Sequence, residues 1–264
     1  MPKKTTPTAG NELEATQSLK SLCVFRMAGS QNDEAQKVGL LRLRLQEAYP
    51  QSRDIDEGTL TRFLRARSHN VDKALKFLLQ HLKWGETYKP PGYVQESEIA
   101  NELKKDKVFA QGADKSGRII VVILVARHFP SDRNLEEFKR FAIYVLDKLA
   151  SISGDLDKFV LLADMKGFSY RNMDVKGFIA CLEILQDHYP ERLGKLFLLH
   201  CPSLFWILWR ILYPFIDPNI REKIVFVDDE LLKETLLKDI DITQLPIEYG
   251  GLMTMVPIRD VKAS

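Results

Sequence analysis

Short apolar runs alternate with longer amphipathic segments over most of the chain. The runs at 119–125, 159–163, 196–200 and 224–227 have the length of β-strands. Continuous apolar runs of this length are typical of strands that are covered on both faces. Between them, apolar residues recur at helical spacing, and we predict two amphipathic helices there. Their inner faces are formed by Phe138, Phe141, Ala142, Val145, Leu146 and Leu149, and by Val175, Phe178, Ile179, Leu182 and Leu185.

The order of these elements predicts a mostly parallel sheet. A further strand at 108–111 is joined to the run at 119–125 by a short segment in which Asp114 and Gly117 are typical turn residues, which predicts a hairpin. The later strands are separated by helices, and a strand–helix–strand crossover belongs to parallel strands. The chain therefore has the pattern of an α/β fold with helices on the faces of the sheet.

The segment 204–213 differs from the other predicted helices because it is apolar nearly all round. Arg210 is its only charged residue, Pro202 lies at its predicted start and Pro214 ends it. It is too short to span a bilayer, which takes roughly 20 apolar residues. Two interpretations are open. It is either a core helix buried on both sides, or a lid between a lipid cavity and a membrane, which its two tryptophans favour.

The N-terminal third has another composition. Residues 1–38 are rich in small polar residues and predict a disordered tail. Met27 is an alternative start, and the acidic residues Glu12 and Glu14 argue against a transit peptide. Residues 39–92 have helical periodicity and end in a Pro-Pro-Gly sequence, which predicts a small all-helical unit.

Three arginines lie close together in this helical unit. Arg62, Arg65 and Arg67 surround an apolar face that contains Leu60 and Phe63. Such a cluster is either a solvated helix face or a phosphate site, because guanidinium forks match phosphate oxygens.

Composition excludes several classes of function. The 38 basic and 36 acidic residues give a net charge of +2, which offers no case for binding nucleic acid. Cys23, Cys181 and Cys201 are widely spaced, which predicts reduced thiols in an intracellular protein. The sequence has no apolar run of spanning length and no recognisable signal peptide, so we expect a soluble, cytoplasmic protein.

Catalytic motifs are missing where this fold class would carry them. The sequence contains no GxSxG elbow, no GxxxxGK[ST] phosphate loop and no GxGxxG turn. Its five histidines are scattered without metal-ligand spacing; two of them, His188 and His200, flank the segment around 204–213, and we interpret them as hydrogen-bonded core residues. We therefore predict a binding protein that is not an enzyme and has no metal.

Five motifs, taken in order, resemble the CRAL-TRIO lipid-binding family. They are RFLRAR at 62–67, DMKG at 164–167, YPERLGKLFLLHCP at 189–202, PFIDPNIREKI at 214–224 and LPIEYGG at 245–251. The similarity covers roughly residues 59–253 and is greatest to the phosphatidylinositol-transfer branch of the family. Five motifs in the same order are far more specific than any single one.

The resemblance implies a fold and the residue bounds of its domains. A sheet floors a deep lipid pocket in a domain at 93–254, a short tail follows at 255–264, and the small helical unit precedes the domain. In the family a mobile gating helix closes over the pocket and opens at the membrane, and residues 203–213 match it. The implied pocket and gate residues are Phe159, Leu161, Leu204, Phe205, Leu208, Trp209 and Leu212.

The resemblance also implies a headgroup site. It assigns the phosphoinositide headgroup to Arg67, with Arg62 and Arg65 as neighbours, and to Glu191 and Lys223. An arginine and Lys223 can neutralise a phosphodiester, while Glu191 can orient Lys223 or accept hydrogen bonds from inositol hydroxyls. In the alternative interpretation, a Glu191–Lys223 ion pair only locks the C-terminal segment.

Three departures from the branch bear on the ligand. Ser68 stands where a lysine is frequent, and Ile220 replaces a hydroxyl residue near the phosphate. Members that also bind phosphatidylcholine have a polar Ser/Thr pair in the strand at 159–162, which is entirely apolar here. A choline headgroup buried without polar partners is costly, so we expect the second ligand to be an apolar or sterol-like lipid and not phosphatidylcholine.

The resemblance thus implies a monomeric, transiently membrane-associated carrier of single phosphatidylinositol molecules that needs no cofactor besides the bound lipid. It moves lipid between phospholipid membranes or presents phosphatidylinositol to a lipid kinase. Two other classes stay open: a protein-interaction or regulatory module with a vestigial pocket, and a hydrolase or transferase on an α/β scaffold.

Overall fold

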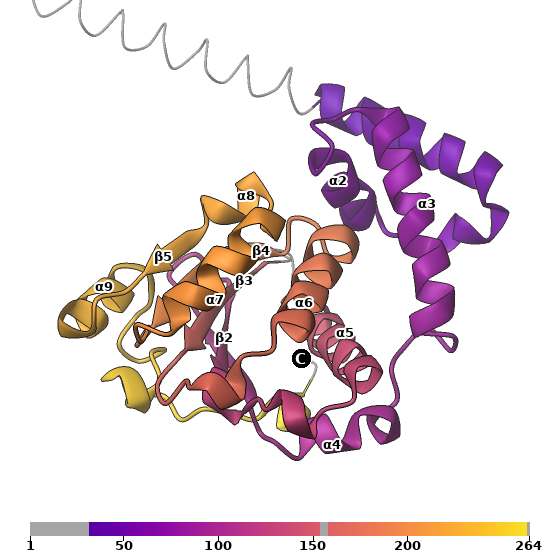
Figure 1. Ribbon diagram of the computed structural model, residues 1–264. Helices are drawn as coiled ribbons and strands as arrows, with labels where there is room; N and C mark the ends of the chain where they lie inside the picture. The colour runs from indigo at the N-terminus through magenta and orange to yellow at the C-terminus, as the bar shows by residue number, and fades with distance from the viewer. Residues whose placement is uncertain (1–31, 154–157, 263–264) are drawn as a thin grey trace, which may run out of the picture. The chain divides into compact units, whose positions relative to one another are not determined.

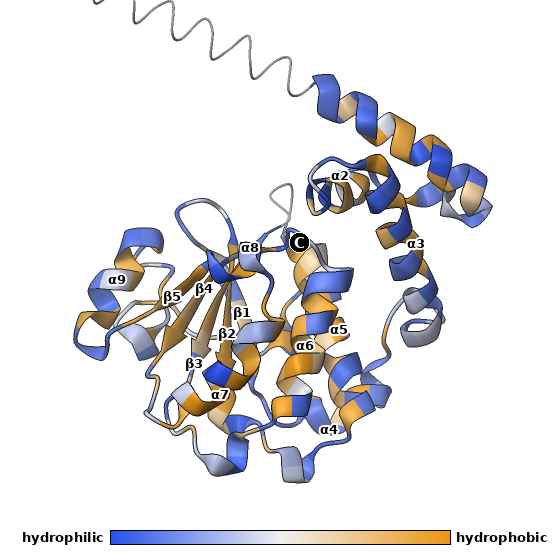
Figure 2. Ribbon diagram, turned by 45° about the horizontal axis from the view of Figure 1, so that its top comes forward, coloured by the Kyte–Doolittle hydropathy of each residue, from blue (hydrophilic) through white to orange (hydrophobic). Residues whose placement is uncertain are grey.

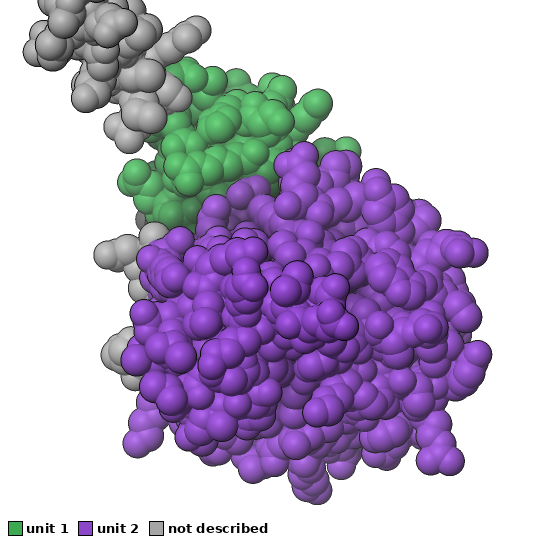
Figure 3. Space-filling model, turned by 90° about the vertical axis from the view of Figure 1, so that its left-hand side faces the viewer, with its two compact units in different colours: residues 1–79 green, residues 80–264 purple. Residues whose placement is uncertain are grey.

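The computed structural model describes residues 32–153 and 158–262. The chain divides into two compact units, Met1–Leu79 and Gln80–Ser264 (Figure 3). The division falls inside helix α3 (Val71–Tyr88), so this helix contributes residues to both units. The domain limits inferred from the sequence, with a change at residue 92, remain predictions.

The described part of the first unit is helical. Its elements are residues 32–48, η1 (Pro50–Asp54), α2 (Glu57–Arg65) and the first part of α3. Side chains cap the two later helices: Asp56 accepts a hydrogen bond from the backbone N–H of Thr59 at 2.8 Å, and Asn70 accepts one from that of Lys73 at 2.9 Å. The buried core of the unit contains Leu41, Leu45, Leu60, Phe63, Leu64 and Leu78.

The first described helix begins within the segment that we expected to be a disordered tail. Residues 32–38 are helical, and Val38 is only 4% exposed. Val38, Leu41 and Leu45 follow one another at helical spacing, so all three lie on the buried face of the helix. The remainder of the expected tail, with Cys23 and Met27, lies outside the described residues.

The second unit is built around a five-stranded sheet with the strand order β1-β2-β3-β4-β5 (Figure 1). The strands are β1 (Val108–Ala113), β2 (Ile119–Leu124), β3 (Phe159–Asp164), β4 (Leu193–Leu199) and β5 (Ile224–Phe226). β1 and β2 form an antiparallel hairpin, whose turn is closed by a 2.8 Å hydrogen bond from Asp114 N to Arg118 O. The other neighbours are parallel, as the apolar runs predicted.

Helices connect the parallel strands. α5 (Leu135–Ile152) joins β2 to β3, α6 (Val175–His188) joins β3 to β4, and α7 (Phe205–Leu212), η7 (Tyr213–Phe215) and α8 (Pro218–Arg221) join β4 to β5. The strands are added in one direction, so right-handed crossovers place all of these helices on the same face of the sheet. α9 (Leu232–Asp239) covers the opposite face (Figure 1).

The alternation of side chains along each strand divides the core into two layers. On one face of the sheet, Val122, Leu162 and Phe197 pack in one cluster with Leu236 of α9. Neighbouring residues such as Val121 point to the other face, where they meet α5 and α6. The strands are accordingly hydrophobic along most of their length in Figure 2, whereas α9 alternates between hydrophobic and hydrophilic residues.

The segment after α9 returns to the carboxyl end of the sheet. The Tyr249 hydroxyl donates a hydrogen bond to Asp164 Oδ2 at 3.0 Å. A Cβ atom at Gly251 would lie 1.9 Å from Leu245 O, so only glycine fits there. Short helices complete the unit: η2 (Glu96–Ile99), α4 (Ala100–Leu103), η3 (Val125–Arg127), η4 (Pro130–Asp132), η6 (Tyr170–Asn172), η8 (Asp229–Leu231), η9 (Ile247–Tyr249) and η10 (Ile258–Asp260).

Candidate functional site

A cavity of about 280 Å³ lies between the sheet and the helices α5, α6 and α7. Leu161 and Leu196 line it from the sheet, and Phe141, Leu182 and Leu208 line it from the three helices. Among the described residues of its wall, polar side-chain atoms belong only to Lys107, His128, Cys181 and the indole of Trp209. Its volume is near the lower end of the range of about 300–1,000 Å³ that is usual for small-molecule sites.

Most of the pocket and gate residues expected from the sequence lie at this cavity. The lining residues among them are Phe159, Leu161, Phe205, Leu208, Trp209 and Leu212. Leu204 does not line the cavity; it is the N-cap residue of α7 and packs beside it, partly buried. The helix begins at Phe205, whose N–H donates to the carbonyl of Pro202 at 2.9 Å, so the proline lies in the turn before the helix.

Helix α7 separates the cavity from solvent. On its inner face, Leu208 is 1% exposed and makes part of the wall. On its outer face, Trp206, Ile207 and Ile211 are 46%, 51% and 41% exposed. The interpretation of a helix buried on both sides is therefore wrong: only the inner face is covered, and the outer face exposes these three apolar side chains together with Arg210. The outer face extends onto Phe226, whose ring stacks on Trp206 with centroids 4.9 Å apart.

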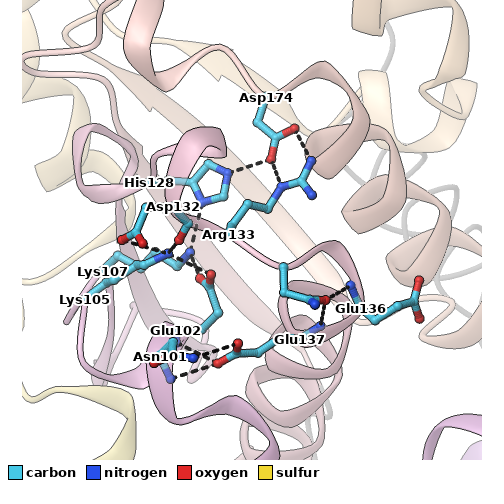
Figure 4. Close-up of polar contacts among 11 residues, drawn as sticks. Asn101, Glu102, Lys105, Lys107, His128, Asp132, Arg133, Glu136, Glu137 and Asp174 are labelled. Atoms are coloured by element: carbon cyan, nitrogen blue, oxygen red, sulfur yellow. Dashed lines mark hydrogen bonds and ion pairs between the residues drawn. The ribbon is translucent and has the colours of Figure 1, made fainter.

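A network of buried charged side chains closes the end of the cavity near the carboxyl end of β2 (Figure 4). The Lys107 ammonium pairs with Glu102 and lies 3.0 Å from His128 Nδ1. His128 Nε2 lies 2.9 Å from Asp174, which also pairs with the Arg133 guanidinium. These five side chains are each at most 10% exposed, and they come from three stretches of the chain, 102–107, 128–133 and the residue before α6.

The protonation states in this network follow from burial and charge. Burial and the neighbouring Lys107 ammonium lower the pKa of His128 to about 4, so its ring is neutral at pH 7. Neutral His128 then accepts a hydrogen bond from Lys107 through Nδ1 and donates one to Asp174 through Nε2. Burial works against ionisation of Asp174, but hydrogen bonds from Arg133 and from the backbone N–H of Gly177 hold its pKa below the usual range.

The network satisfies its own polar groups and so forms a wall. The Lys107 ammonium also lies over the ring of Phe138, 4.5 Å from the centroid, and 5.1 Å from that of Phe141. Cys181 belongs to the same wall, and burial raises the pKa of its thiol to about 12. The sequence analysis missed this network, because nothing in the spacing of residues 102 to 174 indicates that these side chains meet.

A second cluster of charged side chains lies at the amino ends of the parallel strands. Lys223 Nζ is 3.9 Å from Glu191 Oε2, so the structure brings together two residues of the expected headgroup site. Lys158 Nζ, which was not among the expected residues, is also 3.9 Å from that oxygen. Glu191 has a φ of +61°, a conformation that is unfavourable for a residue with a side chain and that occurs more often at functional sites.

The three arginines of the expected headgroup site lie in the first unit, whereas Glu191 and Lys223 lie in the second. Arg65 Nε and Nη2 each donate to Glu34 at 2.7 Å. Arg67 lies 3.5 Å above the ring of Phe77, and Arg62 donates to a threonine hydroxyl at 2.6 Å. Their part in a headgroup site remains a prediction.

The described residues hold no helix long and apolar enough to cross a bilayer. Within the same residues, no group of three or more His, Cys, Asp or Glu side chains is arranged to hold a metal ion.

The second unit is thus an α/β fold in which crossover helices on one face of the sheet cover an apolar cavity. The sequence model of the CRAL/TRIO domain matches residues 103–251, and the chain belongs to this family. The family resemblance stated from the sequence motifs is thereby confirmed.

Individual relatives agree with this assignment. The chain is 31% identical over 213 residues to "Phosphatidylinositol transfer protein CSR1" of Eremothecium gossypii, a match that covers 75% of this chain and 48% of the relative. It is 30% identical over 221 residues to "CRAL-TRIO domain-containing protein YKL091C" of Saccharomyces cerevisiae, covering 75% and 71%. The chain thus spans about half the length of the first relative and about seven tenths of the second.

A solved structure gives the same fold. The protein matches the structure described as "Crystal structure of Sfh5" with a TM-score of 0.58 and 18% sequence identity, over 76% of this chain and 81% of that one. The mostly parallel sheet with surrounding helices, predicted from the apolar runs, is confirmed by this match and by the strand pairing.

Proposed function

We propose that the protein carries one lipid at a time in the cavity behind α7 and exchanges phosphatidylinositol between membranes. The observation that carries this proposal is the position of α7, a helix with one face on an apolar cavity and an outer face that exposes Trp206, Ile207 and Ile211 to solvent beside Arg210. An exposed face of this kind partitions into a membrane interface. The name of the first relative, a phosphatidylinositol transfer protein, supports the choice of ligand.

The energetics of the lipid require an enclosed cavity. Each CH₂ group of an acyl chain that leaves the bilayer for water costs about 0.8 kcal/mol, so a chain must pass directly from one apolar environment to another. When the outer face of α7 enters the interface, its inner face uncovers the cavity, and acyl chains take the place of Leu208 and Leu212. The exchange needs no bond chemistry.

The headgroup remains at the amino edge of the sheet in this proposal. Lys223 neutralises the phosphodiester, and Glu191 orients Lys223 or accepts hydrogen bonds from inositol hydroxyls. The distance of 3.9 Å between Lys223 Nζ and Glu191 Oε2 supports this arrangement over a locked ion pair, because it exceeds that of a closed charge-assisted hydrogen bond.

The wall of the cavity disfavours phosphatidylcholine as a second ligand. Phe159 and Leu161 line the cavity where a polar pair would be needed to hold a choline headgroup. The proposed second ligand is therefore an apolar or sterol-like lipid. In this proposal the protein acts in the cytoplasm and attaches to membranes transiently. It also presents phosphatidylinositol to a lipid kinase.

Native mass spectrometry with lipid extraction tests the proposal. The protein is incubated with vesicles that contain phosphatidylinositol, phosphatidylcholine and a sterol, and is then separated from them. We expect phosphatidylinositol on the wild type and its loss from Lys223→Ala and Glu191→Ala. Lys238→Ala, on the exposed surface of α9, is the matched control and should bind as the wild type does.

Two outcomes would contradict the proposal. Major retention of phosphatidylcholine would refute the choice of second ligand. A wild-type protein that takes up no lipid from any vesicle would refute the carrier function, and an interaction module with a vestigial pocket would then be the better explanation.

A further inference from the structure

Lys158, Glu191 and Lys223 are brought together by the register of the parallel strands. Lys158 directly precedes β3, Lys223 directly precedes β5, and Glu191 lies two residues before β4, the strand between them. Backbone hydrogen bonds fix these starts: Phe159 N donates to Arg192 O at 3.0 Å, and Leu196 N donates to Lys223 O at 2.8 Å. The three side chains therefore meet at the amino ends of these three neighbouring strands.

Both lysines lie near Glu191, but neither forms a direct hydrogen bond with it. Each Nζ lies 3.9 Å from the same oxygen, Glu191 Oε2, whereas a charge-assisted N–H···O hydrogen bond is about 2.7–2.9 Å long. Since both distances end on one atom, the two ammonium groups are at most about 7.8 Å apart. A phosphate has several acceptor oxygens on one centre, so it can accept from both groups at once.

The charges of this trio are unbalanced. Two ammonium groups and one carboxylate leave an excess of one positive charge, and the three side chains are only 24% to 42% exposed. A phosphodiester with an uncharged headgroup supplies one negative charge, which balances these three side chains. A zwitterionic phospholipid also brings an ammonium group, which the second lysine repels.

Each member of the trio is close in sequence to a residue that lines the cavity, although none of the three lines it. Phe159 follows Lys158 directly, Ile224 follows Lys223 directly, and both line the cavity. Leu193, two residues after Glu191, lines it as well. A lipid whose chains fill the cavity and whose headgroup reaches this edge places its phosphate among the three charged side chains.

We infer that Lys158 and Lys223 hold the phosphate of the lipid from both sides of Glu191, and that Lys158 makes the site selective for an anionic phosphodiester over zwitterionic phospholipids. The inference rests on the proposed lipid-carrier function and adds a residue and a basis of selectivity to it. Lys223 alone would balance Glu191 and leave no net attraction for an anionic headgroup. Lys158 supplies the excess charge.

A competition experiment tests this inference. Protein is loaded from vesicles with equal amounts of phosphatidylinositol and phosphatidylcholine plus a sterol, and the bound lipids are quantified by mass spectrometry. We expect Lys158→Ala to lower the ratio of bound phosphatidylinositol to phosphatidylcholine by about tenfold, the typical effect of losing a hydrogen bond to a charged group. Lys158→Arg should restore it, and Lys238→Ala should leave it unchanged.

Two further readouts separate selectivity from damage to the fold. Uptake of the sterol and the melting temperature should be the same for Lys158→Ala as for the wild type, because Lys158 is 42% exposed. Raising the salt concentration should lower phosphatidylinositol loading less in Lys158→Ala than in the wild type, since fewer charges are screened.

The possible failures are distinguishable. If the wild type binds phosphatidylinositol, Lys223→Ala does not and Lys158→Ala keeps the wild-type ratio, the role of Lys158 is refuted while the carrier function stands. If Lys158→Arg behaves like Lys158→Ala, the charge argument is refuted. If the wild type takes up no phosphatidylinositol, the proposed function itself fails.

Discussion

The exposed face of α7 gives the sharpest test of the proposed mechanism. Ile207 and Ile211 lie one helical turn apart and are 51% and 41% exposed. We predict that the double variant Ile207→Ala/Ile211→Ala binds vesicles about 30-fold more weakly than the wild type. Alanine is the best helix former, so the helix itself should persist in the variant.

The magnitude follows from the exposed area. Full burial of an isoleucine side chain is worth about 1.5–3 kcal/mol, and roughly half of each side chain is available to a membrane. Truncation to alanine therefore removes about 1 kcal/mol of membrane affinity at each position. Two positions give about 2 kcal/mol, which corresponds to a factor of about 30 in the dissociation constant.

The matched control lies elsewhere in the same unit. Ile242 and Ile247 are 40% and 57% exposed in the segment that follows α9. Flotation with neutral vesicles measures the binding of both double variants, and transfer of a fluorescent lipid between vesicles measures exchange. The reasoning is wrong if the α7 variant floats like the wild type, or if Ile242→Ala/Ile247→Ala loses as much binding.

Three further predictions concern the charged groups and the buried thiol. Lys107→Met removes one of the two lysine partners of the buried Glu102 carboxylate, Lys105 being the other. It should lower the free energy of unfolding by about 1–3 kcal/mol in urea titrations, and an unchanged free energy would contradict this. Hydrogen bonds from Arg65 hold the pKa of Glu34 at about 2, below the ordinary 4.5. The stability that the Glu34 carboxylate gives to the fold is therefore complete above pH 4.5 and is lost as the pH falls towards 2. The melting temperature of Glu34→Gln should fall less over this range than that of the wild type, and parallel curves would refute the assignment. The third prediction uses a variant that lacks the other two cysteines. Burial and a pKa of about 12 should make Cys181 in this variant react with iodoacetamide at pH 8 at least about a hundredfold more slowly than a free thiol. Rapid labelling would show that α7 does not seal the cavity.

The sheet and its helices were predictable because burial itself leaves a pattern. A strand covered on both faces must be apolar along most of its length, as β3 is from Phe159 to Ala163, and an amphipathic helix such as α5 repeats its apolar residues at helical spacing. The start of the first helix was less visible, because Val38 is the only large apolar residue in its first two turns. Length and periodicity thus predict elements better than they predict their ends.

The candidate site was predictable only in part. In α7 the single charged residue, Arg210, marks the side that solvent reaches, but one residue was too weak a signal to show from the sequence whether the other side chains of that face are covered. The buried network around Lys107 and His128 depends on contacts between three stretches of the chain, which no local pattern encodes. Glu191 and Lys223 were found through the family motifs, whereas Lys158 lies outside those motifs and became visible only through the strand register.

The placement of the crossover helices also sets how fast different parts of the molecule exchange their amide hydrogens. The amides of β3 are bonded to strands on both sides, whereas α7 has eight residues and holds its own hydrogen bonds. A helix of this length is marginal in water on its own, so it is retained by the contacts of its inner face. Amides of α7 should therefore exchange with deuterium long before those of β3, and occupancy of the cavity can be followed in time through the protection of a single short helix.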